Sequence, residues 1–91
     1  MNENAQKQKK TIRLITLSTC FFCNRVKKML DEAGFKYEST DIDMLPEDER
    51  EKKMTEIRKH NPQESFPIVI IGDRAFVGFQ EENIKKELGI S

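Results

Sequence analysis

The chain has 91 residues, enough for one domain with a modest hydrophobic core. Its 16 basic residues are balanced by 16 acidic ones, so no net charge attracts nucleic acid or an anionic membrane surface. Hydrophobic residues make up 36% of the chain, and no apolar run approaches the length that spans a bilayer. We therefore expect neither nucleic-acid binding nor membrane insertion.

The first ten residues differ from the rest of the chain. Residues 1–10 are polar and contain lysine, and no apolar stretch follows them, so we expect a flexible tail and not a secretory signal. Residues 11–91 are expected to form one domain. Two closely spaced cysteines without such a signal are typical of a reducing compartment, so the expected location is the cytoplasm.

Strand and helix patterns alternate after the tail. Residues 11–17 are nearly all apolar or β-branched, which predicts a central strand buried on both faces. Apolar residues then recur at helical spacing as far as Ala33, and Gly34 is the expected C-cap. The alternating residues 35–43 predict a second, more exposed strand.

The second half of the chain continues this alternation. A second helix is expected to begin at Pro46 and to end at Asn61, with a thin apolar stripe. Residues 67–71 and 75–79 predict two strands joined by a tight hairpin turn, and residues 81–88 predict a short last helix. The order β-α-β-α-β-β-α predicts an α/β domain, with a four-stranded mixed sheet and helices on both faces.

Two cysteines, Cys20 and Cys23, lie where the first strand gives way to the first helix. A helix N-terminus presents unpaired N–H groups and a partial positive charge, which favour a thiolate. The spacing puts both sulfurs on one side of a turn, so a disulfide can form and break without refolding. We assign Cys20, at the helix start, as the nucleophile. Cys23, one turn deeper, is assigned as the thiol that resolves the mixed disulfide.

A structural metal site is the alternative use of these cysteines. Tetrahedral zinc needs about four ligands, and His60 is the only other candidate that the sequence offers. We therefore predict no metal ligands.

Two phenylalanines lie between the cysteines. Phe21 has no apolar partner at helical spacing and is expected to be an exposed contact for the substrate. Phe22 has two possible roles, in the core because of its spacing to Val26 or in a groove because it lies near Cys20. Gln80 begins the last helix, whose free N–H groups either bind a carboxylate or are simply capped.

Three segments together resemble the glutaredoxin family over residues 12–88. Cys20-x-x-Cys23 follows the first strand, and Ser65-Phe66-Pro67 stands where the family carries Thr-Val-Pro. Gly78-Phe79-Gln80-Glu81 stands where the family carries a Gly-Gly or Gly-Phe turn before the last helix. The resemblance implies a thioredoxin-like fold and thiol–disulfide oxidoreductase activity.

The resemblance also implies roles for residues outside the cysteine pair. The peptide bond before Pro67 is expected to be cis, with Pro67 facing the disulfide as part of the catalytic site. The backbone of Phe66 is expected to pair with the substrate as a short strand. Family members bind glutathione in a groove between the cysteines, the proline segment and the last helix. By position, the groove residues here are Phe22, Ser65, Phe66, Gly78, Phe79, Gln80 and Glu81.

We expect a dithiol glutaredoxin that reduces protein disulfides or glutathione mixed disulfides, with no bound cofactor and with glutathione as reductant. An alternative is a glutaredoxin-like donor recharged by thioredoxin reductase, a flavoprotein. Leu17 stands where many members carry a glutathione-binding lysine, and Glu64 where a basic residue is frequent. The Gly78-Phe79 turn is also more like that of these donors.

A third hypothesis, from a different class, is a non-catalytic scaffold for a metal or an iron–sulfur cluster. The second cysteine and the bulky Phe21-Phe22 pair argue against it. The expected partners are disulfide-containing or glutathionylated proteins, together with glutathione or a flavoprotein disulfide reductase. The protein is expected to act as a monomer.

Overall fold

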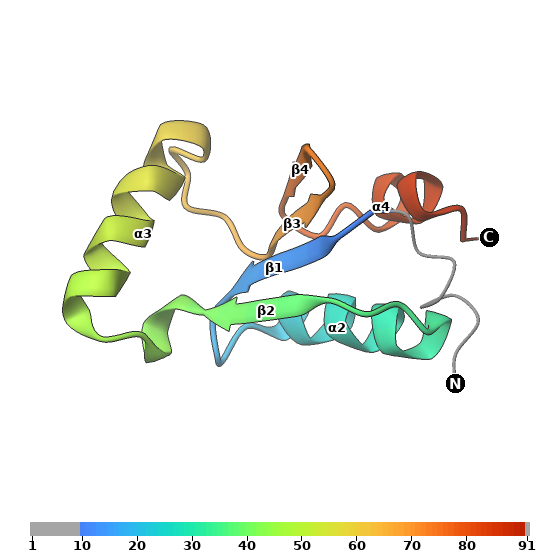
Figure 1. Ribbon diagram of the computed structural model, residues 1–91, viewed down its shortest axis with the longest axis horizontal. Coiled ribbons are helices and arrows are strands. Elements are labelled where there is room, and N and C mark those ends of the chain that lie inside the picture. Colours follow the sequence, from blue (N-terminus) through green and yellow to red (C-terminus); the bar gives the residue numbers. More distant parts are fainter. Residues whose placement is uncertain (1–9, 91) are drawn as a thin grey trace.

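The computed structural model describes residues 10–90 and has the predicted order of strands and helices, with one added 3-10 helix (Figure 1). The elements in chain order are β1 (Ile12–Thr16), α2 (Phe21–Ala33), β2 (Glu38–Asp41), η1 (Ile42–Met44), α3 (Glu47–His60), β3 (Ile68–Ile71), β4 (Arg74–Val77) and α4 (Glu81–Leu88). Most of the predicted tail, residues 1–9, lies outside the described residues.

The four strands form one mixed sheet in the order β2-β1-β3-β4. β1 pairs with β2 in parallel, because α2 carries the chain back across the sheet between them. β3 runs antiparallel to both β1 and β4. The turn between β3 and β4 has Gly72 at φ +62°, a left-handed conformation that favours glycine, and the predicted hairpin is confirmed.

The hydrophobic core has two parts, one on each face of the sheet. On one face, α2 and α4 pack against β1, β3 and β4 through a cluster that consists of Ile12, Leu14, Val26, Leu30, Val69, Ile71, Phe76 and Ile84. On the other face a smaller cluster of Ile42, Ile57 and Ile68 joins η1, α3 and β3. The helices therefore cover both faces, as predicted, and α3 lies apart from α2 and α4 (Figure 1).

The first strand is buried on only one of its faces, which corrects the prediction. Ile12, Leu14 and Thr16 are buried, whereas Arg13 is exposed and Ile15 is half-buried. The reason is that α3 covers its face of the sheet incompletely. A cavity of about 300 Å³ lies there, lined in part by Arg13 and Ile15.

The second strand is shorter than the predicted span of residues 35–43. Phe35 and Tyr37 precede β2 and pack against the larger core cluster. After Asp41 the chain turns into η1, where Ile42 is buried. The predicted strand thus divides into a segment that packs on the core, a short strand and a 3-10 turn.

Helix ends follow the capping signals closely. Gly34 caps α2 at φ +82°, in the left-handed region, and donates its N–H to Asp31 and Leu30 carbonyls. Pro46 was predicted to be the first helical residue, but it is the N-cap of α3, which begins one residue later at Glu47. Among residues 10–90, none of the helices is long and apolar enough to cross a membrane.

Candidate active site

Cys20 is the N-cap of α2, directly after the loop that leaves β1. Its sulfur accepts a hydrogen bond from the backbone N–H of Cys23 at 3.2 Å, as an N-cap side chain does. Both cysteines are free thiols, and Cys20 is partly exposed while Cys23 is 0% exposed. A substrate can therefore reach Cys20 directly, whereas Cys23 lies beneath it.

The loop before Cys20 is tied to η1, the 3-10 helix that follows β2. The backbone N–H of Ser18 donates to Asp43 Oδ1 at 2.8 Å, and the Ser18 hydroxyl donates to Oδ2 of the same carboxylate. These hydrogen bonds hold the pKa of Asp43 below its ordinary value. The carboxylate is therefore charged at neutral pH and fixes the loop two residues before Cys20. Neither Ser18 nor Asp43 was identified from the sequence.

The two thiols differ in their chemical surroundings. The pKa of Cys23 is raised to about 12, first by burial and then by its hydrogen bond with Cys20. Cys23 is therefore a neutral thiol at pH 7 while no substrate is bound. This division agrees with the predicted roles of Cys20 as nucleophile and Cys23 as resolving thiol.

The predicted proline segment lies next to the turn before α4. The Phe66–Pro67 peptide bond is cis, as expected, and Pro67 is buried. The carbonyl of Pro67 accepts a hydrogen bond from the N–H of Gly78 at 2.8 Å. Gly78 has φ +81°, so this turn uses the conformational freedom of glycine. This hydrogen bond joins the predicted Ser65-Phe66-Pro67 segment directly to the predicted turn that begins at Gly78.

Ser65 is held by a residue that sequence reasoning treated only as a helix end. Asn61 Nδ2 donates to the Ser65 carbonyl at 2.8 Å, and Asn61 Oδ1 accepts from the Ser65 N–H at 3.2 Å. Asn61 is buried at 2% exposure. Both backbone polar groups of Ser65 are therefore engaged within the protein. The sequence signal for this role was the Asn61-Pro62 pair at the end of α3. A buried asparagine amide needs hydrogen-bond partners, and here the backbone of Ser65 supplies them.

Aromatic rings form the rim beside Cys20. Phe21 is 64% exposed and Phe22 is 54% exposed, with their ring centroids 5.3 Å apart. Phe22 also lies 6.3 Å from Phe79, which comes from the turn before α4. The exposure of Phe22 rules out its core alternative. The guanidinium of Arg25 lies over the Phe21 ring at 5.8 Å.

The start of α4 carries polar and acidic residues. Gln80 is the N-cap residue of α4, but its side chain accepts no hydrogen bond from the backbone of the helix. Instead, its amide nitrogen donates to the Val77 carbonyl at 2.9 Å. Glu81 and Glu82 lie in the first turn. Their negative charges already complement the helix dipole, so an anionic ligand would meet repulsion there.

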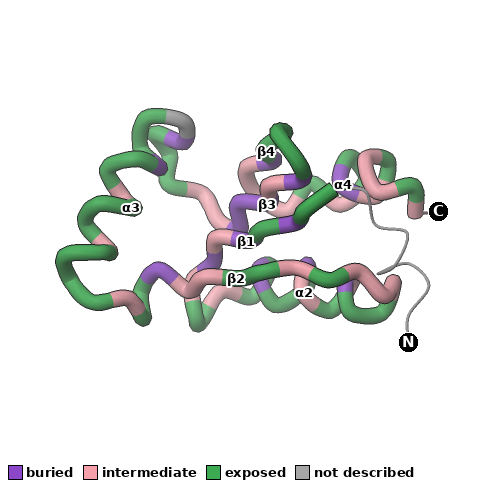
Figure 2. Tube along the Cα trace, viewed as in Figure 1, coloured by how far each residue is buried: buried purple, intermediate pink, exposed green. Residues whose placement is uncertain are grey.

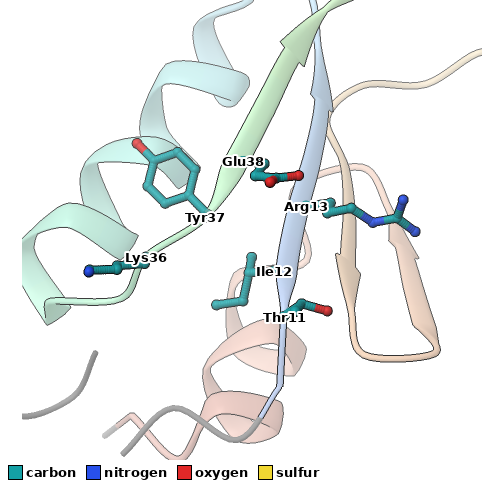
Figure 3. Close-up of a pocket in the computed structure, with 6 residues that line it drawn as sticks. All are labelled: Thr11, Ile12, Arg13, Lys36, Tyr37 and Glu38. Carbon is teal, nitrogen blue, oxygen red and sulfur yellow. The ribbon is translucent and has the colours of Figure 1, made fainter. Parts of the chain in front are cut away.

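A separate pocket of about 310 Å³ lies at the other end of β1 from Cys20 (Figure 3). Its lining residues are Thr11, Ile12, Arg13, Lys36, Tyr37 and Glu38. It contains none of the predicted site residues. Among the side chains that the structure describes, which are those of residues 10–59 and 61–90, no group of three or more histidine, cysteine, aspartate or glutamate residues is placed to hold a metal ion.

An ion pair beside the buried cysteine was also missed from the sequence. Lys27 follows Cys23 by four residues on α2, and its Nζ lies 3.5 Å from Asp41 Oδ1 at the end of β2. The helical spacing of Lys27 was visible in the sequence. Its partner was not, because only the fold brings the end of β2 to α2.

Comparisons with known proteins agree with this geometry. The glutaredoxin family model matches residues 12–77. Glutaredoxin 1 of Rickettsia prowazekii is 32% identical over 79 residues, which is 85% of this chain and 79% of that protein. The glutaredoxin-like protein NrdH of Escherichia coli K12 is 27% identical over 75 residues, covering 82% of this chain and 85% of its own.

A solved structure supports the same assignment. The glutaredoxin from Methanosarcina mazei superposes with a TM-score of 0.76 at 38% identity, covering 88% of this chain and 79% of its own. The thioredoxin-like fold implied by the sequence is therefore confirmed. With its Cys20-x-x-Cys23 motif at a helix N-terminus, the chain belongs to the glutaredoxin family and is a thiol–disulfide oxidoreductase.

Proposed function

We propose that the protein reduces disulfides of other proteins and mixed disulfides with glutathione, and that glutathione recharges it in the cytoplasm. The observation that carries the proposal is the accessible Cys20 thiol above the buried Cys23 thiol. Cys20 attacks a substrate disulfide, and one substrate thiol leaves. Cys23 then attacks Cys20, which releases the second thiol, so two electrons pass from the dithiol to the substrate.

A second electron donor, a flavoprotein disulfide reductase, is favoured by the rim of the site. Leu17 is apolar where a lysine would attract a glutathione carboxylate. Phe21, Phe22 and Phe79 offer apolar contact area, which suits a protein surface better than a small anion. Similarity to the NrdH glutaredoxin-like proteins points the same way.

The two donors are separated by two assays run in parallel. One follows turnover of a glutathione mixed disulfide with glutathione and glutathione reductase. The other follows reduction of an insulin-type disulfide with thioredoxin reductase. Turnover only in the first assay supports glutathione as the donor, and turnover only in the second supports the flavoprotein.

The matched control is Cys20→Ser, which removes the nucleophile and keeps the size of the side chain. We expect no turnover by this variant in either assay, because Cys23 is buried and protonated at neutral pH. Retained turnover would overturn the assignment of Cys20. Silence of the unmodified protein in both assays would overturn the proposed function.

A further inference from the structure

The helix face that carries Cys23 also carries a lysine one turn further on. Cys23 and Lys27 are four residues apart on α2, and residues at this spacing are neighbours on a helix surface. Cys23 is 0% exposed, and the Lys27 side chain is only 23% exposed. Most of the Lys27 side chain is therefore covered by the rest of the protein.

The sheet holds Lys27 in that position. Its Nζ lies 3.5 Å from Asp41 Oδ1, and the Asp41 side chain is 31% exposed. The same oxygen accepts a hydrogen bond from the Thr16 hydroxyl at 2.5 Å, and Thr16 is 0% exposed. Thr16 ends β1 and Asp41 ends β2, so two paired strands fix the carboxylate against which the ammonium group rests.

We propose that Lys27, anchored by Asp41, is a positioning residue that stabilises the Cys23 thiolate while Cys23 resolves the mixed disulfide. This inference rests on the proposed function. In that step Cys23 gives its proton to water and becomes a thiolate, and the sulfur that later leaves with the substrate departs as a thiolate that takes up a proton from water. The Cys23 sulfur then bonds to Cys20 Sγ, the bond between Cys20 and the substrate breaks, and the substrate leaves as a thiol.

The charges around Cys23 explain why this step needs help. Burial raises the pKa of the Cys23 thiol to about 12, and the Lys27 charge acts in the opposite direction. Within residues 10–90, Cys20 and Lys27 are the groups whose charge acts on this thiol. In the mixed disulfide Cys20 carries no charge, and the positive charge of Lys27 still lowers the pKa of Cys23. Asp41, on β2, faces Lys27.

The test separates the two chemical steps in a single experiment. The reduced protein is mixed with the aromatic disulfide 5,5′-dithiobis(2-nitrobenzoate), which releases one coloured thiolate when Cys20 attacks and a second when Cys23 resolves. We expect Lys27→Met to slow the second release on the order of tenfold at neutral pH and to leave the first unchanged. The pH at which the second release reaches half its maximal rate should rise.

Three control variants isolate the positive charge of Lys27 as the cause of the slower release. Lys27→Arg keeps the charge and should restore the second release. Lys28→Met removes a neighbouring lysine that is less buried, and should leave both releases unchanged. The double variant Lys27→Met with Asp41→Asn removes both charges, and it should stay slower than the unmodified protein if Lys27 itself stabilises the thiolate.

The outcomes distinguish this inference from the proposed function. A second release that is equally fast in Lys27→Met and Lys28→Met overturns the inference alone. So does a double variant that recovers the full rate, because the slowing would then come from an unpaired Asp41. Absence of the first release in the unmodified protein overturns the proposed function, and the inference with it.

Discussion

Cys20 and Cys23 share one helical turn and have opposite access to solvent. Cys20 is the N-cap, where its sulfur takes the place of the usual oxygen acceptor. Cys23 is one turn into the helix, on the face that packs against the sheet. Exposure of one thiol and burial of the other is what allows a mixed disulfide to form on Cys20 first.

Replacement of Cys23 by serine should separate the two kinds of substrate. Cys23→Ser is expected to keep part of its activity on glutathione mixed disulfides, because a second glutathione can resolve the intermediate on Cys20. Its activity on protein disulfides should fall to background, since the internal resolving thiol is gone. Mass spectrometry of the trapped species should find the substrate bound to Cys20.

The same measurement on Cys20→Ser provides the control. The buried Cys23 should form no substrate adduct in that variant at neutral pH, because its pKa of about 12 keeps it protonated. An adduct on Cys23 that forms as fast as the one on Cys20 would contradict the assigned roles.

Residue roles that depend on local spacing could be predicted from the sequence, and those that depend on distant partners could not. The cysteine roles followed from the position of Cys20 at a helix start. The hydrogen bond that Ser18 donates to Asp43 joins residues 25 positions apart, and so does the one that Thr16 donates to Asp41. Charged residues at and just after strand ends are common on surfaces, so nothing in the sequence singled out Asp41 and Asp43.

At the scale of elements, α2 and α3 differ in how firmly they are attached to the sheet. α2 buries Cys23, Val26 and Leu30 completely. α3 has one buried residue among those whose burial is described, Ile57 at 6% exposure, with Met54 half-buried beside it. Figure 2 shows this contrast as buried segments along α2 and a mostly exposed α3.

Hydrogen exchange should therefore be faster in α3 than in α2. Local opening costs less free energy where few apolar contacts are lost, so α3 amides are expected to be protected at least about tenfold less than those of the central turns of α2. Exchange followed residue by residue with nuclear magnetic resonance measures both helices in one sample. Equal protection in the two helices would mean that α3 opens only with the whole domain.

Element order was predictable because each segment carried its own period and end signals. Element lengths were less so, as β2 shows. Residues 35–43 were predicted as one strand, yet only Glu38–Asp41 pair with β1, and Asp41 lies opposite Thr16, the last residue of β1. A strand cannot extend beyond the last residue of its neighbour that offers it a backbone hydrogen bond. The end of β2 is therefore set by the end of β1 and cannot be read from the sequence of β2 alone.

At the scale of the whole molecule, two raised pKa values predict how stability depends on pH. The pKa of Cys23 is raised from 9.0 to about 12, mainly by burial. The pKa of Tyr37 is raised from 10.0 to about 12, by burial first and then by its hydrogen bond with Asp31. Both groups keep their protons in the folded protein at pH values where the unfolded chain has lost them.

The sign of the effect follows from proton binding. Between about pH 9 and about pH 12 the folded protein binds more protons than the unfolded chain, so the free energy of unfolding must fall as pH rises. Below about pH 9 both groups are protonated in both states, and their contribution is fully present. Urea unfolding at a series of pH values from about 8 to about 11 measures this decline.

Tyr37→Phe and Cys23→Ser test the origin of the decline, since each removes one titrating group. Each variant is expected to be less stable than the unmodified protein near pH 8, because a packed or hydrogen-bonded group is lost. The difference should then shrink at alkaline pH, where the unmodified protein bears the cost of deprotonation and the variant does not. A difference that stays constant across the series would mean that neither group titrates differently in the folded and unfolded states.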